Sequence, residues 1–213
     1  SETSVGECVV VDVSKYFNKI LNISEKEQTV TVQPGVVRDE LNRYLRPFGL
    51  FFGPNTSTSN RCMIGGMVGN NSSGSTSIKY GVTRDKVLEL QTILSDGSCV
   101  VFKDLTSEEF DQKQTLNTLE GDIYRTVKFE LSSREVQKQI ESNFPKPEIH
   151  RRNTGYAIDE LIKTEVFSDS YLGITEKKKP FNFCKLLSGS EGTLAFTTQI
   201  TLKLDVLPPV NSV

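Results

Sequence analysis

Short segments in which apolar and polar residues alternate mark both ends of the chain, and such alternation is typical of strands with one buried face. Residues 29–33 read Thr-Val-Thr-Val-Gln and run into a Pro-Gly break, so a strand is predicted there. Residues 87–94 and 99–102 lie on either side of Ser-Asp-Gly-Ser, which predicts a hairpin because Asp-Gly tolerates the positive φ of a tight turn. Further strands are expected at 8–13, which reads as a buried run, and at 194–204, where apolar residues fall on even positions.

Apolar residues at helical spacing predict helices between these strands. One helix is expected over 37–48, where a Pro-Phe-Gly sequence ends it, and another over 123–131. Ser132 and Glu135 have the spacing of a capping box for a following helix, and a short helix is expected at 156–163. Strands at both ends with helices in the centre favour an α+β fold over a doubly wound sheet.

Composition and charge exclude several function classes. The chain has 213 residues and 25 basic against 27 acidic side chains, a balance that argues against nucleic acid as a partner. Its four cysteines, Cys8, Cys62, Cys99 and Cys184, are far apart and form no C-x-x-C pair, so no metal or iron–sulfur site is expected within the chain. This cysteine usage favours a reducing, cytoplasmic environment. No apolar run of about 18 residues is present to span a membrane.

The segment 64–81, which reads IGGMVGNNSSGSTSIKYG, is the strongest candidate for a binding element. Five glycines lie among Asn, Ser and Thr, and glycine lets backbone approach a ligand closely because it has no Cβ. Free amides in such a loop suit a phosphate or an electron-rich ring, so a large, flat, phosphorylated cofactor is predicted. The alternative is a flexible linker, which the apolar residues within the segment disfavour.

Three glycine-containing loops recur at predicted strand ends, at 33–36, at 52–57 and at 189–194. The chain contains neither a P-loop sequence nor G-x-G-x-x-G, so phosphates would be held by backbone amides and hydroxyls. In order and spacing these loops resemble the FAD-linked oxidase family, whose fold is that of vanillyl-alcohol oxidase and p-cresol methylhydroxylase. The likeness is to the D-lactate, glycolate and D-2-hydroxyglutarate dehydrogenase branch. The matching segments are 34–36, 54–57, 64–74, 79–85 and 189–194, together with 150–156, which is similar to large bacterial proteins that join a flavin part to an iron–sulfur part.

The resemblance implies an α+β FAD-binding domain of the p-cresol methylhydroxylase type, with a mixed or antiparallel sheet flanked by helices. Residues 1–213 would be part of that domain, with a core of 8–105 and 184–206 and a helical insertion of about 106–183. We expect the N-terminal subdomain with the pyrophosphate loop to be missing, with residues 3–4 as its vestige. Its absence would leave a strand edge open to self-association.

The resemblance also implies the residues that contact FAD. Segments 54–57 and 64–74 match the loops around the pyrophosphate and the isoalloxazine, and residues 70–73 would donate to the pyrimidine edge. Glu191 would lie near the adenosine end, with a capping role as its alternative, and Tyr80 has core packing as its alternative. The implied set is Pro34, Pro54, Asn55, Thr56, Ser57, Ile64, Gly65, Gly66, Asn70, Asn71, Ser72, Ser73, Gly74, Tyr80, Gly81, Glu191 and Gly192.

The chemistry that the resemblance implies is oxidation of a small D-2-hydroxy acid by hydride transfer to flavin. No residue qualifies as the catalytic base, since the lone His150 is more typical of a surface residue. We expect the chain to be an enzyme portion that is inactive alone and whose own retention of FAD is an open question. An iron–sulfur cluster would belong to the parent protein only, and the location would be cytoplasmic or peripheral at the inner membrane face. The alternatives are an enol-ether reductase of the same fold and a non-catalytic nucleotide-binding or assembly module.

Overall fold

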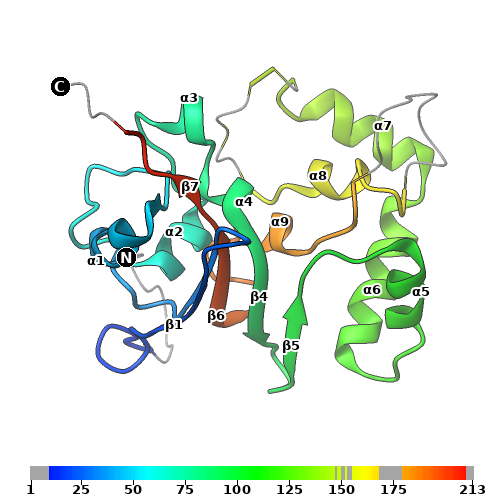
Figure 1. The fold of residues 1–213 in the computed structure, drawn as a ribbon. Helices are drawn as coiled ribbons and strands as arrows, with labels where there is room; N and C mark the ends of the chain where they lie inside the picture. Colours follow the sequence, from blue (N-terminus) through cyan, green and yellow to red (C-terminus); the bar gives the residue numbers. More distant parts are fainter. Residues whose placement is uncertain (1–9, 147, 150–151, 153–154, 168–178, 210–213) are drawn as a thin grey trace.

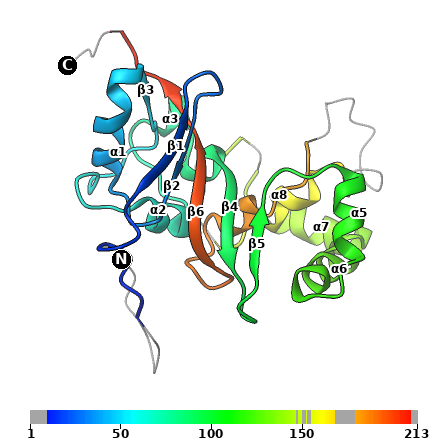
Figure 2. The same cartoon turned by 60° about the horizontal axis from the view of Figure 1, so that its bottom comes forward.

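The computed structural model describes residues 10–146, 148–149, 152, 155–167 and 179–209 (Figure 1). Five strands form one sheet in the order β1-β2-β6-β4-β5, and every pairing in it is antiparallel (Figure 2). These strands are β1 (Ile20–Ser24), β2 (Thr29–Val32), β6 (Phe196–Lys203), β4 (Val87–Ile93) and β5 (Cys99–Phe102). Two short strands, β3 (Leu50–Phe51) and β7 (Asp205–Val206), pair separately. Because β6 lies between β2 and β4, the sheet joins residues from both ends of the chain.

Helices lie at both ends of the sheet. They are α1 (Arg38–Leu45), continued by a 3₁₀ turn (Arg46–Phe48), α2 (Ile64–Asn70), α3 (Ser77–Tyr80), α4 (Thr83–Lys86), α5 (Ser107–Gln114), α6 (Leu119–Leu131), α7 (Arg134–Asn143), α8 (Ile158–Ile162) and α9 (Cys184–Leu187). In both views α1 lies on the side of β1 and α5, α6 and α7 lie on the side of β5 (Figures 1 and 2), whereas α2 packs against the sheet itself. None of the helices that the structure describes is long and apolar enough to cross a membrane.

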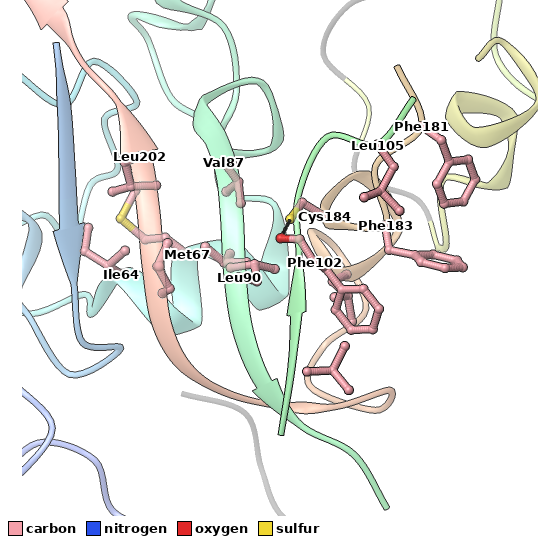
Figure 3. Packing of buried hydrophobic residues seen from close by; sticks show 14 of the residues in the cluster. Ile64, Met67, Val87, Leu90, Phe102, Leu105, Phe181, Phe183, Cys184 and Leu202 are labelled. Atoms are coloured by element: carbon pink, nitrogen blue, oxygen red, sulfur yellow. Dashed lines mark hydrogen bonds between the residues drawn. The ribbon is translucent and has the colours of Figure 1, made fainter. Parts of the chain in front are cut away.

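The core under the sheet follows the alternation seen in the sequence. Val30 and Val32 of β2 are buried, and Val30 pairs in register with Leu202 of β6. Ile64 and Met67 of α2 point toward these strands (Figure 3). Burial of aliphatic side chains of this size contributes about 1.5–3 kcal/mol each, so this layer fixes α2 against the sheet.

A second packed region, which we call the aromatic cluster, consists of Phe102, Phe110, Tyr124, Phe167, Phe181 and Phe183. Phe181 is fully buried and its ring centroid lies 4.7 Å from that of Phe110 and 4.8 Å from that of Phe183. The backbone of Phe181 also exchanges hydrogen bonds with Leu105, which follows β5. The aromatic cluster therefore attaches α5 and α6 to the edge of the sheet.

Several predicted elements are confirmed. The strand at 29–33, the helix at 37–48, the helix over 123–131 and the hairpin are present, with Gly97 in the hairpin turn at φ 84°. The strand predicted at 194–204 begins at Phe196, and its first apolar residues are more than a third exposed.

Other expectations are wrong. Of the strand predicted at 8–13, the described residues 10–13 form no strand, and Val10 is 73% exposed. The physical reason is that β1 is already the outermost strand on the β2 side of the sheet. The chain at 13–17 instead contacts the turn at Gly35, whose amide donates to the Phe17 carbonyl. The glycine-rich segment, expected as a loop, is helical over α2 and α3.

The capping box predicted at Ser132 and Glu135 is also wrong. The Ser132 hydroxyl donates to the Lys128 carbonyl at the end of α6, and Ser133 precedes α7 without a side-chain cap. The division into a core and a helical insertion over 106–183 stays a prediction. Residues 3–4, 8–9 and His150 lie outside the described residues.

Candidate functional site

The helix α2 has one apolar face and one face with almost no side chains. Ile64, Met67 and Val68 are buried beneath it. Gly66, Gly69 and Asn70, which are spaced i, i+3 and i+4 and so share one side of a helix, form the opposite surface, which we call the glycine face. The outer surface of this helix is therefore mainly backbone.

The glycines of this region differ in what their missing Cβ would meet. A Cβ on Gly65 would lie 2.5 Å from Pro34 Cβ, and one on Gly74 would lie 1.5 Å from the Asn55 carbonyl oxygen. A Cβ on Gly66 would meet no atom within 4 Å, and one on Gly69 would come no closer than 3.7 Å to Gly192 N. Gly65 and Gly74 are thus required by packing within the protein, whereas Gly66 is not.

Glycine at position 66 therefore lowers the stability of the helix, and no packing contact within the protein requires it. Glycine in a helix interior is about 1 kcal/mol less favourable than alanine. Positions that break a local rule without an internal gain are expected at functional sites. An open glycine on an exposed helix face allows a flat ligand to contact the backbone directly.

The glycine loops meet around α2. The Gly65 amide donates to the Pro34 carbonyl at 2.8 Å, and the Glu191 amide donates to the Gly69 carbonyl at 2.8 Å. The Gly189 amide donates to the Val68 carbonyl at 2.9 Å. The turn at Pro34 thus lies at the start of the helix, and the loop at 189–192 lies along its end.

Polar side chains border the glycine face. The Asn70 side-chain amide donates to the Glu191 carboxylate at 3.2 Å, and the Ser72 hydroxyl donates to the Asn70 side-chain carbonyl at 3.1 Å. Glu191 has φ 55°, in the left-handed region, and is exposed. A Cβ on Gly192 would meet nothing within 4 Å. This exposed border offers both hydrogen-bond donors and acceptors beside open backbone.

The segment 54–57 lies near the start of α2. Pro54 is buried and its carbonyl accepts from Arg38 Nε at 3.2 Å. The Thr56 hydroxyl lies 3.2 Å from Cys62 Sγ, and Asn55 packs against Gly74 as described above. Ser57 is exposed. The structure thus connects this segment to Cys62, just before the glycine-rich stretch, and to Gly74 within it.

Tyr80 packs against residues that directly precede segment 54–57. Its ring packs edge-on against Phe51 with centroids 5.0 Å apart, and a Cβ on Gly53 would lie 2.6 Å from Tyr80 Cβ. Gly81 has φ 76° and donates its amide to the Ser77 carbonyl at 2.9 Å. Tyr80 thus packs on Phe51 and Gly53 while it stays half-buried, and its contact with the cofactor stays a prediction.

Asn71 and Ser72, which follow α2, are hydrogen-bonded to other parts of the protein. Asn71 is fully buried, its side-chain carbonyl accepts from the Arg84 amide at 2.8 Å, and its side-chain amide donates to the Arg152 carbonyl at 3.3 Å. The Ser72 carbonyl accepts from the Thr83 hydroxyl at 2.7 Å, and Ser73 is half-buried. The Asn71 side chain is therefore engaged with protein and not directed at the glycine face.

Sequence reasoning missed Arg84, which is only 6% exposed. Its Nε donates to the Lys185 and Ser188 carbonyls at 2.9 and 3.0 Å, and its Nη2 donates to Ser188 at 2.6 Å. Burial, reinforced by the nearby Arg152 charge, lowers the pKa of the Arg84 guanidinium. Arg84 lies within the matching segment 79–85, but nothing in the spacing shows that its side chain is buried.

A charged group lies next to this arginine. Arg152 forms ion pairs with Asp159 and, at 2.9 Å, with Glu160, and Lys163 contacts both carboxylates at 2.9 Å. These charges compensate one another. In the described part of the chain, no group of three or more His, Cys, Asp or Glu side chains is placed to hold a metal ion.

Comparisons with known proteins identify an FAD binding domain in the N-terminal half of the chain. Residues 1–103 match the model of the FAD binding domain family. A D-2-hydroxyglutarate dehydrogenase of Escherichia coli (strain K12) is 39% identical over 207 residues, which is 97% of this chain and 19% of that protein. A mitochondrial D-lactate dehydrogenase (cytochrome) of Kluyveromyces lactis is 38% identical over 101 residues, 47% of this chain and 17% of that protein.

The fold has a solved counterpart. An alkyldihydroxyacetonephosphate synthase superposes with a TM-score of 0.50 at 19% identity, over 91% of this chain and 22% of that one. That likeness supports the α+β fold alone. The chain spans about a fifth of the length of the curated relatives given above. Residues 1–103 therefore belong to the FAD binding domain family, and the chain as a whole is similar to the D-2-hydroxyglutarate dehydrogenase given above.

Proposed function

We propose that this chain is the FAD-binding portion of an oxidoreductase that oxidises a small D-2-hydroxy acid of the D-lactate, glycolate or D-2-hydroxyglutarate class. The observation that carries the proposal is the glycine face, an exposed helix surface with open backbone at Gly66 and a polar border at Asn70 and Glu191. The identity with a D-2-hydroxyglutarate dehydrogenase over 97% of the chain supports the substrate class.

The residues present fit a flat dinucleotide. Gly66 would let it approach the α2 backbone, because a Cβ there would meet no atom within 4 Å, whereas Gly69 lies against the backbone of Glu191 and Gly192. Asn70 and Ser72 offer donors, and the Glu191 carboxylate would accept from hydroxyl groups. FAD, when bound, supplies the hydride acceptor for oxidation of the substrate carbinol carbon.

The seventeen residues from Pro34 to Gly192 named above remain the proposed cofactor site, with roles divided by the geometry. We propose that Gly66, Asn70, Glu191 and Gly192 face the ligand, because all four are exposed. Gly65, Gly74, Asn71 and Tyr80 would shape the site through protein contacts. We assign no residue as the catalytic base.

Titration of the 213-residue chain with FAD, followed by the change in flavin fluorescence, tests the cofactor assignment. We expect saturable binding that ADP weakens by competition and that riboflavin alone reproduces poorly, since the site would hold both halves of the dinucleotide. A signal that stays linear with FAD concentration would contradict the proposal.

The reaction is tested in the full-length parent protein. We expect D-2-hydroxyglutarate or D-lactate to bleach its flavin absorption under anaerobic conditions, and the L-enantiomers to leave it unchanged. Bleaching by a reduced nicotinamide cofactor instead would favour an enol-ether reductase. Binding of FAD without reduction by either class would favour the non-catalytic module.

We further propose that the protein acts in the cytoplasm or at the inner membrane face, and that any iron–sulfur cluster lies in other parts of the parent protein. Self-association through an exposed strand edge or apolar face is also proposed. A molecular mass that stays monomeric across a concentration series in solution scattering would refute the self-association.

A further inference from the structure

The guanidinium of Arg84 lies where three segments of the site meet. Arg84 belongs to the short helix α4, its amide donates to the buried side chain of Asn71 at the end of α2, and its side chain reaches the residues that follow α9. Residues 71 and 188 are more than a hundred positions apart in the sequence, so this arginine connects distant parts of the chain.

The hydrogen bonds of Arg84 go to backbone. Its Nε and Nη2 donate to the Ser188 carbonyl at 3.0 and 2.6 Å, and Nε also donates to the Lys185 carbonyl at 2.9 Å. In return, Lys185 Nζ donates to the Arg84 carbonyl at 3.0 Å. A planar guanidinium holds several acceptors in one fixed geometry, which a lysine ammonium does not. The bonds therefore fix the position of the 185–188 backbone.

The position of the 185–188 backbone determines where the loop at 189–192, which borders the glycine face, can lie. Gly189 follows Ser188 directly, and a Cβ on it would lie 2.7 Å from Arg84 Nη2. The Gly189 amide then donates to Val68 and the Glu191 amide to Gly69, both in α2. The loop at 189–192 is thus held between Arg84 on one side and α2 on the other.

We propose that Arg84 is a positioning residue of the cofactor site, which clamps residues 188–192 so that Glu191 and Gly192 lie beside the glycine face before the ligand binds. The inference rests on the proposed function for the identity of the ligand, but the clamp itself is a property of the protein alone. A loop that is ordered before binding raises affinity, because less conformational entropy is lost when the ligand binds.

Two substitutions test this role. Arg84→Met removes the donors at similar side-chain length, and Arg84→Lys keeps the charge without the planar geometry. Arg125→Met is the matched control, because Arg125 also donates to two backbone carbonyls, at Gln114 and Leu116, but in the α5–α6 connection. The readouts are amide hydrogen exchange of the ligand-free chain and the FAD dissociation constant.

For Arg84→Met we expect at least tenfold faster exchange at the amides of Gly189 and Glu191, with protection between β4 and β6 retained. The FAD dissociation constant should rise at least tenfold, and Arg84→Lys should give smaller changes of the same kind. Arg125→Met should change neither quantity at the site.

Unchanged exchange at Gly189 and Glu191 in both Arg84 variants overturns the proposal. Faster exchange with an unchanged FAD dissociation constant overturns it as well. Loss of β4–β6 protection in both variants would make Arg84 a general structural residue and would also overturn it. Failure of the wild-type chain to bind FAD counts against the proposed function alone, and the exchange comparison then decides the clamp.

Discussion

The glycine face is an exposed surface made mainly of backbone, whereas the aromatic cluster is a buried region made of side chains. The outer surface of α2 consists of backbone and one asparagine, and a Cβ on Gly66 would meet no atom within 4 Å. The aromatic cluster consists of side chains, with Phe181 in contact with four other rings. One region gives up stability to leave a surface open, and the other supplies stability without any exposed chemistry.

The magnitudes support this division of roles. Each favourable aromatic pair contributes about 0.5–1.5 kcal/mol beyond the area it buries. Each unneeded helical glycine costs about 1 kcal/mol relative to alanine. A substitution in the aromatic cluster should therefore change the free energy of unfolding, whereas a substitution on the glycine face should change binding.

The largest effect is expected for Phe181→Ala. Removal of this fully buried ring leaves a cavity among Phe110, Tyr124 and Phe183, and should lower the free energy of unfolding by about 3–5 kcal/mol. Urea denaturation measures the change. Phe129→Ala is the matched control, because Phe129 is 80% exposed and its loss should change stability little. Equal effects of the two substitutions would show that the aromatic cluster is not a packed core.

Gly66→Val should act on binding instead. The branched side chain would stand on the open surface, so we expect the FAD dissociation constant to rise at least tenfold, about 1.4 kcal/mol, with the melting temperature nearly unchanged. Ser142→Val, at an exposed position of α7, introduces the same side chain far from the site. Retention of wild-type affinity by Gly66→Val would remove the glycine face from the cofactor site.

Cys184 tests whether water is excluded from the interior beside Phe102 of the aromatic cluster. Its thiol is fully buried and donates to the Phe102 carbonyl at 3.1 Å (Figure 3), and burial raises its pKa well above the ordinary value. The native thiol stays protonated where the unfolded one, with a pKa of about 8.5, ionises. The free energy of unfolding should therefore fall above pH 9, by up to about 1.4 kcal/mol per pH unit.

Denaturation between pH 8.5 and 10 measures this slope, and Cys184→Ala should remove the contribution. Alkylation at pH 8 gives an independent check, since exposed Cys99 should react and Cys184 should stay unmodified until the protein unfolds. Equal alkylation rates of the two thiols would show that solvent reaches Cys184 in the folded protein.

The smallest effect is expected for Gly66→Ala, which should raise the free energy of unfolding by about 0.5–1 kcal/mol, because alanine is the better helix former. A thermal melt should rise by about 2–4 °C for each kcal/mol in a chain of this size. Gly65→Ala is the control, since its Cβ would lie 2.5 Å from Pro34 Cβ and should lower stability. Equal shifts for the two variants would contradict the distinction between packed and open glycines.

Local patterns predicted the elements that depend on neighbouring residues. The alternation at 29–33, the Asp-Gly turn and the helical spacing at 37–48 each produced the expected element. The prediction of a strand at 8–13 was wrong for the described residues 10–13, because a strand also needs a free sheet edge, and a run of valines does not show whether one is available. The helical state of 64–70 was missed, because its glycines have low helix propensity and only packing of Ile64 and Met67 on the sheet stabilises α2.

The sequence by itself determined the α+β class, the likeness to an FAD binding domain and the glycine-containing segments proposed for the site, because turn residues and spaced motifs act over a few positions. Only the tertiary structure decided which glycines serve packing and which stay open, and that Arg84 is buried against Ser188. These properties depend on contacts between residues such as Gly69 and Glu191, which lie far apart along the chain. Local spacing carries no information on such contacts, since they form only when the sheet brings both ends of the chain together.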